Sequence, residues 1–220
     1  MANISKDIAQ SSPDLFVKTL VDKATQNPRL QPILNGLQAI GQFSQNAVIL
    51  SNGWACETTG DNPAITLGFK EIPLEVQNEV FYTASLACPR GYENQLLYRF
   101  NHEVLHKYID VLLFQGQHPK MTELLEIATQ AREEGKLGLS SYGKLVHTET
   151  KGALKQANED VTELLNMYVW HPQYLKDYLD LLASPNTEQL RKKHGLVGLT
   201  HESKDYIYQL VQSIITTPQK

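Results

Sequence analysis

Hydrophobic residues near the start of the chain recur with the spacing of α-helices. In residues 13–24 they lie on one side of an amphipathic helix, which Asn27-Pro28 ends. A second short helix follows and ends near Gly41, because glycine readily adopts the left-handed conformation that terminates helices. We therefore expect residues 1–45 to form a helical N-terminal segment that serves packing.

After these helices the spacing changes to that of β-strands. The apolar run Ala47–Leu50 precedes Asn52-Gly53, a favoured hairpin turn, and the chain is expected to return as a strand at Trp54–Thr58. Ile65–Phe69 predicts a further strand, and residues 79–88 fit either a strand or the start of a helix. A small sheet of three or four strands is expected.

The remainder of the chain has the periodicity of helices. A long helix is predicted from Glu93 to Gly116, and apolar residues cover most of its circumference, so it should be buried. Later helices are expected at residues 121–134, 151–170, 173–183, from Ser184, and 205–215. The pattern predicts an α+β fold with strands first and helices afterwards.

Composition restricts the class of protein. Hydrophobic residues make up 41% of the 220 and charged residues 20%, as in ordinary globular domains with a sizeable core. The net charge of −4, without blocks of like charge, argues against nucleic-acid binding. No secretory signal or apolar run of the ~20 residues that span a bilayer is present, so we expect a cytoplasmic protein without membrane segments, with export that uses no cleaved signal as the alternative. Cys56 and Cys88 are expected to be buried free thiols, with a disulfide as the alternative.

The chemistry suggested by the sequence centres on the pentapeptide His102-Glu103-Val104-Leu105-His106, which matches the pattern HExxH. On a helix, residues four apart lie on the same face, so the two imidazoles can bind one zinc ion. The intervening Glu103 can then act as general base toward a water on that metal. The expected cofactor is Zn²⁺, with Glu103 as the catalytic residue.

A catalytic zinc site normally has a third protein ligand. A histidine six residues beyond the second one is excluded, because Leu112 occupies that position, and His118 falls past the predicted end of the helix. The best candidate is Glu159, with Asp160 and Glu163 as alternatives. Glu159 and Glu163 share a helix face, so one can bind the metal while the other holds a ligand histidine. Asp110, one turn beyond His106, is a second candidate for such an outer role.

The combination of HExxH with a downstream helical Asn-Glu-x-x-x-Glu resembles the gluzincins, which are zincin-fold metallopeptidases whose third zinc ligand is a glutamate. The resemblance covers Asn101–Asp110 and Asn158–Tyr168. It implies one zincin-like domain over residues 1–220, in which the sheet and HExxH helix occupy 46–116 and a helical part with the third ligand occupies 117–220. Many gluzincins have Asp at the position of Glu163.

The expected activity is hydrolysis of a peptide or protein substrate through a zinc-activated water. Donors to the oxyanion are sought at Tyr142, His147, Tyr168 and His171. The resemblance implies that one strand of residues 46–69 binds the extended substrate by edge pairing. Two alternatives stay open: a zincin-fold protein that keeps a structural zinc without activity, and a helical interaction module whose tyrosines form a binding surface. The substrate and the oligomeric state do not follow from the pattern.

Overall fold

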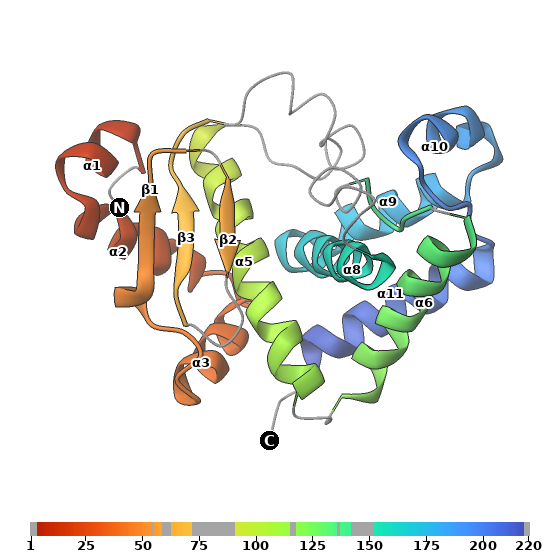
Figure 1. The fold of residues 1–220 in the computed structure, drawn as a ribbon, viewed down its shortest axis with the longest axis horizontal. Helices are drawn as coiled ribbons and strands as arrows, with labels where there is room; N and C mark the ends of the chain where they lie inside the picture. Colours follow the sequence, from red (N-terminus) through yellow and green to blue (C-terminus); the bar gives the residue numbers. More distant parts are fainter. Residues whose placement is uncertain are drawn as a thin grey trace. The chain divides into compact units, whose positions relative to one another are not determined.

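The expected α+β class agrees with the computed structural model, which is mostly helical and has one small sheet (Figure 1). The chain divides into two compact units, and helix α5 (Tyr92–Phe114) runs from the first into the second. The first contains residues 1–78, 88–111 and 218–220, and the second contains 79–87 and 112–217. The structure describes residues 4–53, 55–58, 63–71, 91–114, 118–135, 137–141 and 152–217.

Three helices begin the first unit. Helices α2 (Pro13–Ala24) and α3 (Gln31–Ala39) confirm the two predicted helices, and Gly41 has the expected positive φ of 73° just after α3. The short α1 (Lys6–Ser11) was not predicted, because six residues are too few to show a hydrophobic period. Its start is stabilised by Ser5, whose hydroxyl oxygen accepts a hydrogen bond from the Ile8 N–H.

The predicted hairpin is wrong, although all three strands exist. Strands β1 (Val48–Ser51) and β2 (Cys56–Thr58) do not pair, because β3 (Ile65–Gly68) lies between them, parallel to β1 and antiparallel to β2. The reason is burial: Ile65 and Leu67 are fully buried, and a central strand is covered better than an edge strand. The turn instead meets the chain beyond β3, where the Lys70 N–H donates to the Gly53 carbonyl over 2.8 Å.

The second unit is helical. Helix α8 (Ala153–Trp170) packs against α6 (Pro119–Gly135), α9 (Pro172–Ala183) and α11 (His201–Thr216) (Figure 1). Between the last two lie η3 (Pro185–Thr187) and α10 (Glu188–His194). These helices confirm the predictions within about two residues, except that α11 starts earlier than expected. Its start is set by Thr200, whose hydroxyl accepts from the Ser203 N–H, and a polar first turn gives no apolar signal.

Two further predictions concern residues 79–88 and membrane-spanning segments. Residues 79–88, which fitted either a strand or a helix, lie outside the described residues. Within the described part, no helix combines the length and the apolar character needed to cross a membrane.

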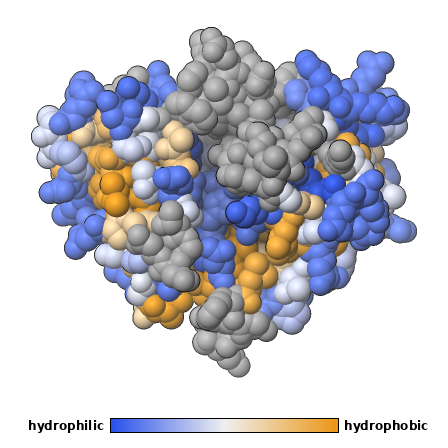
Figure 2. Space-filling view, in the orientation of Figure 1, coloured by the Kyte–Doolittle hydropathy of each residue, from blue (hydrophilic) through white to orange (hydrophobic). Residues whose placement is uncertain are grey.

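The surface is divided between polar and apolar areas. On the face shown in Figure 2, hydrophobic residues gather over β1, whereas the surface over α10 is hydrophilic. Ile49 of β1 is 54% exposed, which is unusual for a large aliphatic residue in a strand. Because β1 and β2 are the two edges of this sheet, the hydrophobic area marks one of them.

Glu93 joins the N-terminal residues to α5. Its carboxylate accepts hydrogen bonds from Lys23 Nζ over 2.6 Å and from the Ile4 N–H over 3.1 Å. Burial alone would raise the pKa of Glu93, but these hydrogen bonds outweigh it and hold the pKa below its ordinary value of 4.5.

Replacing Glu93 should therefore have a pH-dependent effect on stability. At pH 7 we expect Glu93→Gln to lower the free energy of unfolding by up to about 1 kcal/mol, as for other partly exposed ion pairs. A lowered pKa in the folded state stabilises the fold above the unfolded-state pKa, and this contribution is lost as the pH falls through the folded-state value. Urea unfolding from pH 7 to pH 3 should show the two proteins converging. A constant difference across that range would contradict the assignment.

Candidate metal centre

Helix α5 carries the HExxH motif and is buried along most of its length, as predicted. Its start at Tyr92 agrees with the expected Glu93, and Gly116 lies outside the described residues. His102 and Glu103 are each 4% exposed, and His106 is half-buried. Burying ionisable groups is costly unless they are paired, so the helix places the motif where polar partners or a metal are needed.

The two histidines point their ring nitrogens toward one another. The Nε2 atoms of His102 and His106 are 3.0 Å apart, and the rings meet edge to face at 80°. Two zinc–nitrogen bonds of about 2.05 Å at a tetrahedral angle would place the nitrogens about 3.3 Å apart. The pair therefore lies within a few tenths of an ångström of the separation that two ligands of one zinc ion require.

Glu103 lies close enough to strand β2 to influence Cys56. This cysteine is a free, half-buried thiol. Burial raises the pKa of the Cys56 thiol to about 12; the positive charge of Arg99 opposes this shift and the negative charge of Glu103 adds to it. The expected free thiol is thus confirmed for Cys56, whereas Cys88 lies outside the described residues.

Glu159 is buried, which the amphipathic pattern alone did not require. It is 8% exposed, and every residue of α8 from Glu159 to Val169 is buried. The apolar residues of this helix are buried, and the polar residues between them are buried as well. Glu159 is thus not a solvated surface carboxylate, and Glu163, one turn further along, is 4% exposed.

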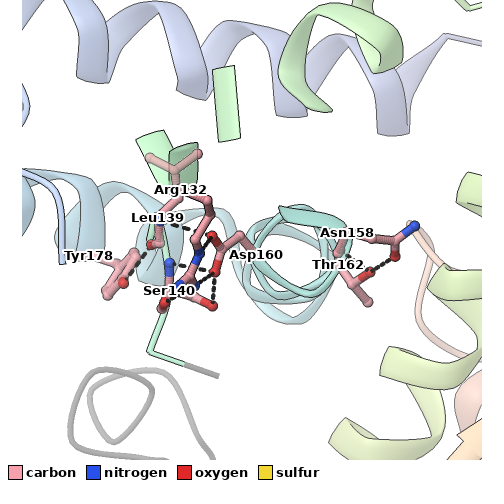
Figure 3. Close-up of polar contacts among 7 residues, drawn as sticks. All are labelled: Arg132, Leu139, Ser140, Asn158, Asp160, Thr162 and Tyr178. Atoms are coloured by element: carbon pink, nitrogen blue, oxygen red, sulfur yellow. Dashed lines mark hydrogen bonds and ion pairs between the residues drawn. The ribbon is translucent and has the colours of Figure 1, made fainter. Parts of the chain in front are cut away.

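A cluster of hydrogen bonds surrounds the next residue of α8, Asp160 (Figure 3). We call Arg132, Leu139, Ser140 and Asp160 the Asp160 cluster. Arg132 donates to both carboxylate oxygens, through Nη2 to Oδ1 over 2.6 Å and Nε to Oδ2 over 2.9 Å. The backbone N–H groups of Leu139 and Ser140 donate over 3.1 and 3.0 Å, and the Ser140 hydroxyl donates over 2.7 Å.

The cluster uses both oxygens of Asp160. Complete burial raises the pKa of this carboxyl, and the hydrogen bonds from Arg132 and Ser140 oppose the rise because they stabilise the ionised form. Because both oxygens already accept hydrogen bonds, Asp160 is not available as the alternative metal ligand that the sequence left open.

The cluster also explains why residue 138 is a glycine. A Cβ at Gly138 would lie 2.0 Å from Arg132 Nη2 and 2.6 Å from the Ser140 carbonyl oxygen. No side chain fits there, since the guanidinium crosses directly over the backbone. Arg132 Nη2 in turn donates to that Ser140 carbonyl over 2.9 Å.

The remaining predicted site residues differ in their burial and in their contacts. Asp110 is exposed, so of the two candidates for an outer role only Glu163 is buried. Tyr168 is buried and its ring packs edge to face against Tyr208 at 5.9 Å. His171 caps α9, because its Nδ1 accepts from the Gln173 N–H over 3.2 Å. The candidate oxyanion donors Tyr142 and His147 lie outside the described residues.

Sequence reasoning missed three buried polar residues near the motif and its proposed partner. Asn101 and Lys107 of α5 are 2% and 1% exposed, and Arg132 of α6 is 4% exposed. Periodicity gave no signal for them, since each is a polar residue on an otherwise ordinary helix. The two glycines Gly135 and Gly138 are the sequence signal that could have indicated a close approach of the backbone to another group, here Arg132.

His102 and His106 of the first unit and Glu159 of the second carry side chains of the kinds that could hold a metal ion. Each offers one ligand atom, an imidazole nitrogen or a carboxylate oxygen, which are the donor types that zinc prefers.

The Cys56 thiol should react slowly. A pKa of about 12 in place of 9.0 leaves about a thousandfold less thiolate at pH 8, and the thiolate is the reactive form. In a Cys88→Ser background, we expect iodoacetamide to alkylate Cys56 far more slowly in the native protein than in urea, as measured by mass spectrometry. Equal rates in both conditions would show that the thiol is neither buried nor perturbed.

Comparison with known proteins adds no relative to this description. The chain matches no protein-family model, no curated protein and no solved structure. The case for a metal centre therefore rests on the residues themselves.

Proposed function

We propose that this protein is a zinc-dependent peptidase, in which His102, His106 and Glu159 bind zinc and Glu103 is the general base. The observation that carries the proposal is the pair of histidine Nε2 atoms 3.0 Å apart on the buried helix α5. Two neutral imidazoles can also hydrogen-bond at this distance, and metal analysis distinguishes the two arrangements.

The available donors fit zinc. Two imidazoles and one carboxylate make up a ligand set used by catalytic zinc sites, in which the fourth position is left for water or substrate. Glu159 is buried with its carboxylate on α8, and burial favours pairing with a cation because an isolated buried charge is unfavourable. Glu163, one turn along α8, is suited to accept the N–H of a ligand histidine.

The reaction follows from these groups. Zinc bound there would act as a Lewis acid that lowers the pKa of a water ligand and polarises the scissile carbonyl. Glu103 takes the proton from the attacking water and passes it to the nitrogen of the leaving amine. Its burial keeps bulk water away from this carboxylate, which strengthens its interactions with the reacting groups.

The sheet offers an edge for the substrate. Because β3 is central, only β1 and β2 of the described strands can pair with an added extended peptide. The electrostatic influence of Glu103 on Cys56 favours β2, since it indicates that this strand is near the general base. We therefore propose that a peptide substrate pairs with β2.

The order of the elements supports a gluzincin-like arrangement. A small sheet precedes the HExxH helix, and the helix with Glu159 follows about fifty residues later within an all-helical region of the described chain. This is the order that the resemblance of the two motifs implies, and we propose a zincin-like fold on that basis.

Replacing the general base should separate metal binding from catalysis. Protein purified without chelators is expected to contain about one zinc per chain by elemental analysis. Glu103→Gln should retain that zinc while cleavage of a proteome-derived peptide library falls by at least about a hundredfold, because the variant cannot accept the water proton. Products are identified by mass spectrometry.

The outcomes distinguish the alternatives. A chain that contains no zinc, and whose melting temperature does not change with chelator, would refute the metal site. Zinc in the wild type without any cleavage that depends on Glu103 would instead indicate a structural zinc in a non-catalytic protein.

Loss of the third ligand should weaken metal binding. Glu159→Gln keeps the size of the side chain but removes its charge, so we expect the affinity for Zn²⁺ to fall by about a hundredfold or more in competition with a chromophoric chelator. Glu126→Gln, at an exposed position of α6, is the matched control and should bind zinc like the wild type. Equal affinities of the two variants would exclude Glu159 as a ligand.

A further inference from the structure

Among the described residues, the Asp160 cluster is a buried polar arrangement that the proposed chemistry does not use. Asp160 is 0% exposed, Ser140 is 2% exposed and Arg132 is 4% exposed. Asp160 is also the immediate neighbour of Glu159 on α8. We propose that Arg132 and Asp160 are positioning residues that set the direction of Glu159 toward the metal. This inference rests on the proposed function, because it assigns a role to residues next to a proposed ligand.

The cluster supplies directional contacts immediately beside Glu159. Apolar contacts around α8 are non-directional and tolerate small rotations of the helix. Asp160 instead accepts hydrogen bonds from five groups on three residues, all between 2.6 and 3.1 Å. Two of them form a bidentate pair with Arg132, whose planar guanidinium permits only a narrow range of orientations. Rotation of α8 would break several of these bonds together.

Helix geometry transmits this constraint to Glu159. Consecutive residues differ by about 100° around the axis and 1.5 Å along it, so fixing Asp160 fixes the Cβ of Glu159. A zinc ligand must be held to within a few tenths of an ångström of its ideal distance. A rotation of only 10° at a Cβ radius of about 3.3 Å moves that atom by roughly 0.6 Å, which already exceeds the tolerance.

Two further features of α8 lie away from Glu159. The helix starts after Gly152, which provides no side-chain cap. The ring contact of Tyr168 with Tyr208 lies more than two turns beyond Glu159. The cluster is fixed in turn to α9, because the Tyr178 hydroxyl donates to the Leu139 carbonyl over 2.7 Å. It also meets the segment after α10, where the Gly138 N–H donates to the Gly195 carbonyl over 2.8 Å.

Stability alone is a weak explanation for the pair. Removing both charges from water is costly, and buried ion pairs replaced by apolar residues of similar volume often leave stability unchanged or improved. What apolar residues cannot reproduce is the orientation. This difference provides a test in which stability and positioning respond differently.

The test uses the full-length chain with Co²⁺ as the probe, since its visible absorption reports the ligands and geometry of the metal. The double variant Arg132→Met/Asp160→Leu removes both buried charges together and is expected to remain folded. It should bind Co²⁺ at least tenfold more weakly than the wild type and show an altered d–d spectrum, as expected when a group that orients a ligand is lost. Arg132→Lys, which keeps the charge but not the bidentate geometry, should give an intermediate affinity.

Tyr178→Phe is the matched control. It removes a buried hydrogen bond to the same segment but leaves every bond of Asp160 in place, so its melting temperature should fall while Co²⁺ affinity and spectrum stay as in the wild type. If the folded double variant binds Co²⁺ with unchanged affinity and spectrum, the positioning role is wrong. If the double variant unfolds, Arg132→Lys against Tyr178→Phe decides by the same criterion. A wild type that does not bind Co²⁺, or one matched by Glu159→Gln, would instead refute the proposed metal site.

Discussion

Burial of ionisable side chains on two helices is the constraint on which this structure depends. Helix α5 buries His102, Glu103 and Lys107, and α8 buries Glu159, Asp160 and Glu163. Each such group loses hydration worth several kcal/mol and must regain it from hydrogen bonds, opposite charges or a metal. The arrangement of the surrounding elements is therefore set by polar partners as well as by hydrophobic packing.

Asp160 shows how this requirement organises the second unit. One carboxylate joins α8 to Arg132 of α6 and to the backbone at Leu139 and Ser140. Because the backbone N–H groups of that segment are satisfied by a side chain, the segment can be buried without forming regular secondary structure. Gly138 is required for the same reason, since the guanidinium occupies the space of a side chain.

In the first unit, strand β2 and helix α5 place a thiol near charged side chains. Strand β3, in which Ile65 and Leu67 are fully buried, takes the central position, which leaves β1 and β2 as the edges of the described sheet. Cys56 on β2 is influenced by both Arg99 and Glu103 of α5, so the strand and the motif share one electrostatic environment. A zinc ion, a general base and a peptide-binding edge would thus be assembled from neighbouring elements of simple geometry.

Most helices, the existence of the three strands and the histidine pair could be predicted from the sequence, because these features depend on contacts within a few residues. Periodicity located α2, α3, α5, α6, α8 and α9, and the spacing of His102 and His106 on one helix face required their proximity. It also selected Glu159 as a ligand, which stays a proposal.

The pairing of the strands and the burial of particular polar residues depend on long-range contacts, so they could not be predicted from local patterns. The local signal of Asn52-Gly53 favoured a hairpin, but the burial of Ile65 and Leu67 between two neighbours outweighed it. Likewise, no local pattern distinguishes Arg132 and Asp160 from surface charges. They are separated by 28 residues, and they meet because their helices pack, so their bidentate pairing exists only in the folded chain.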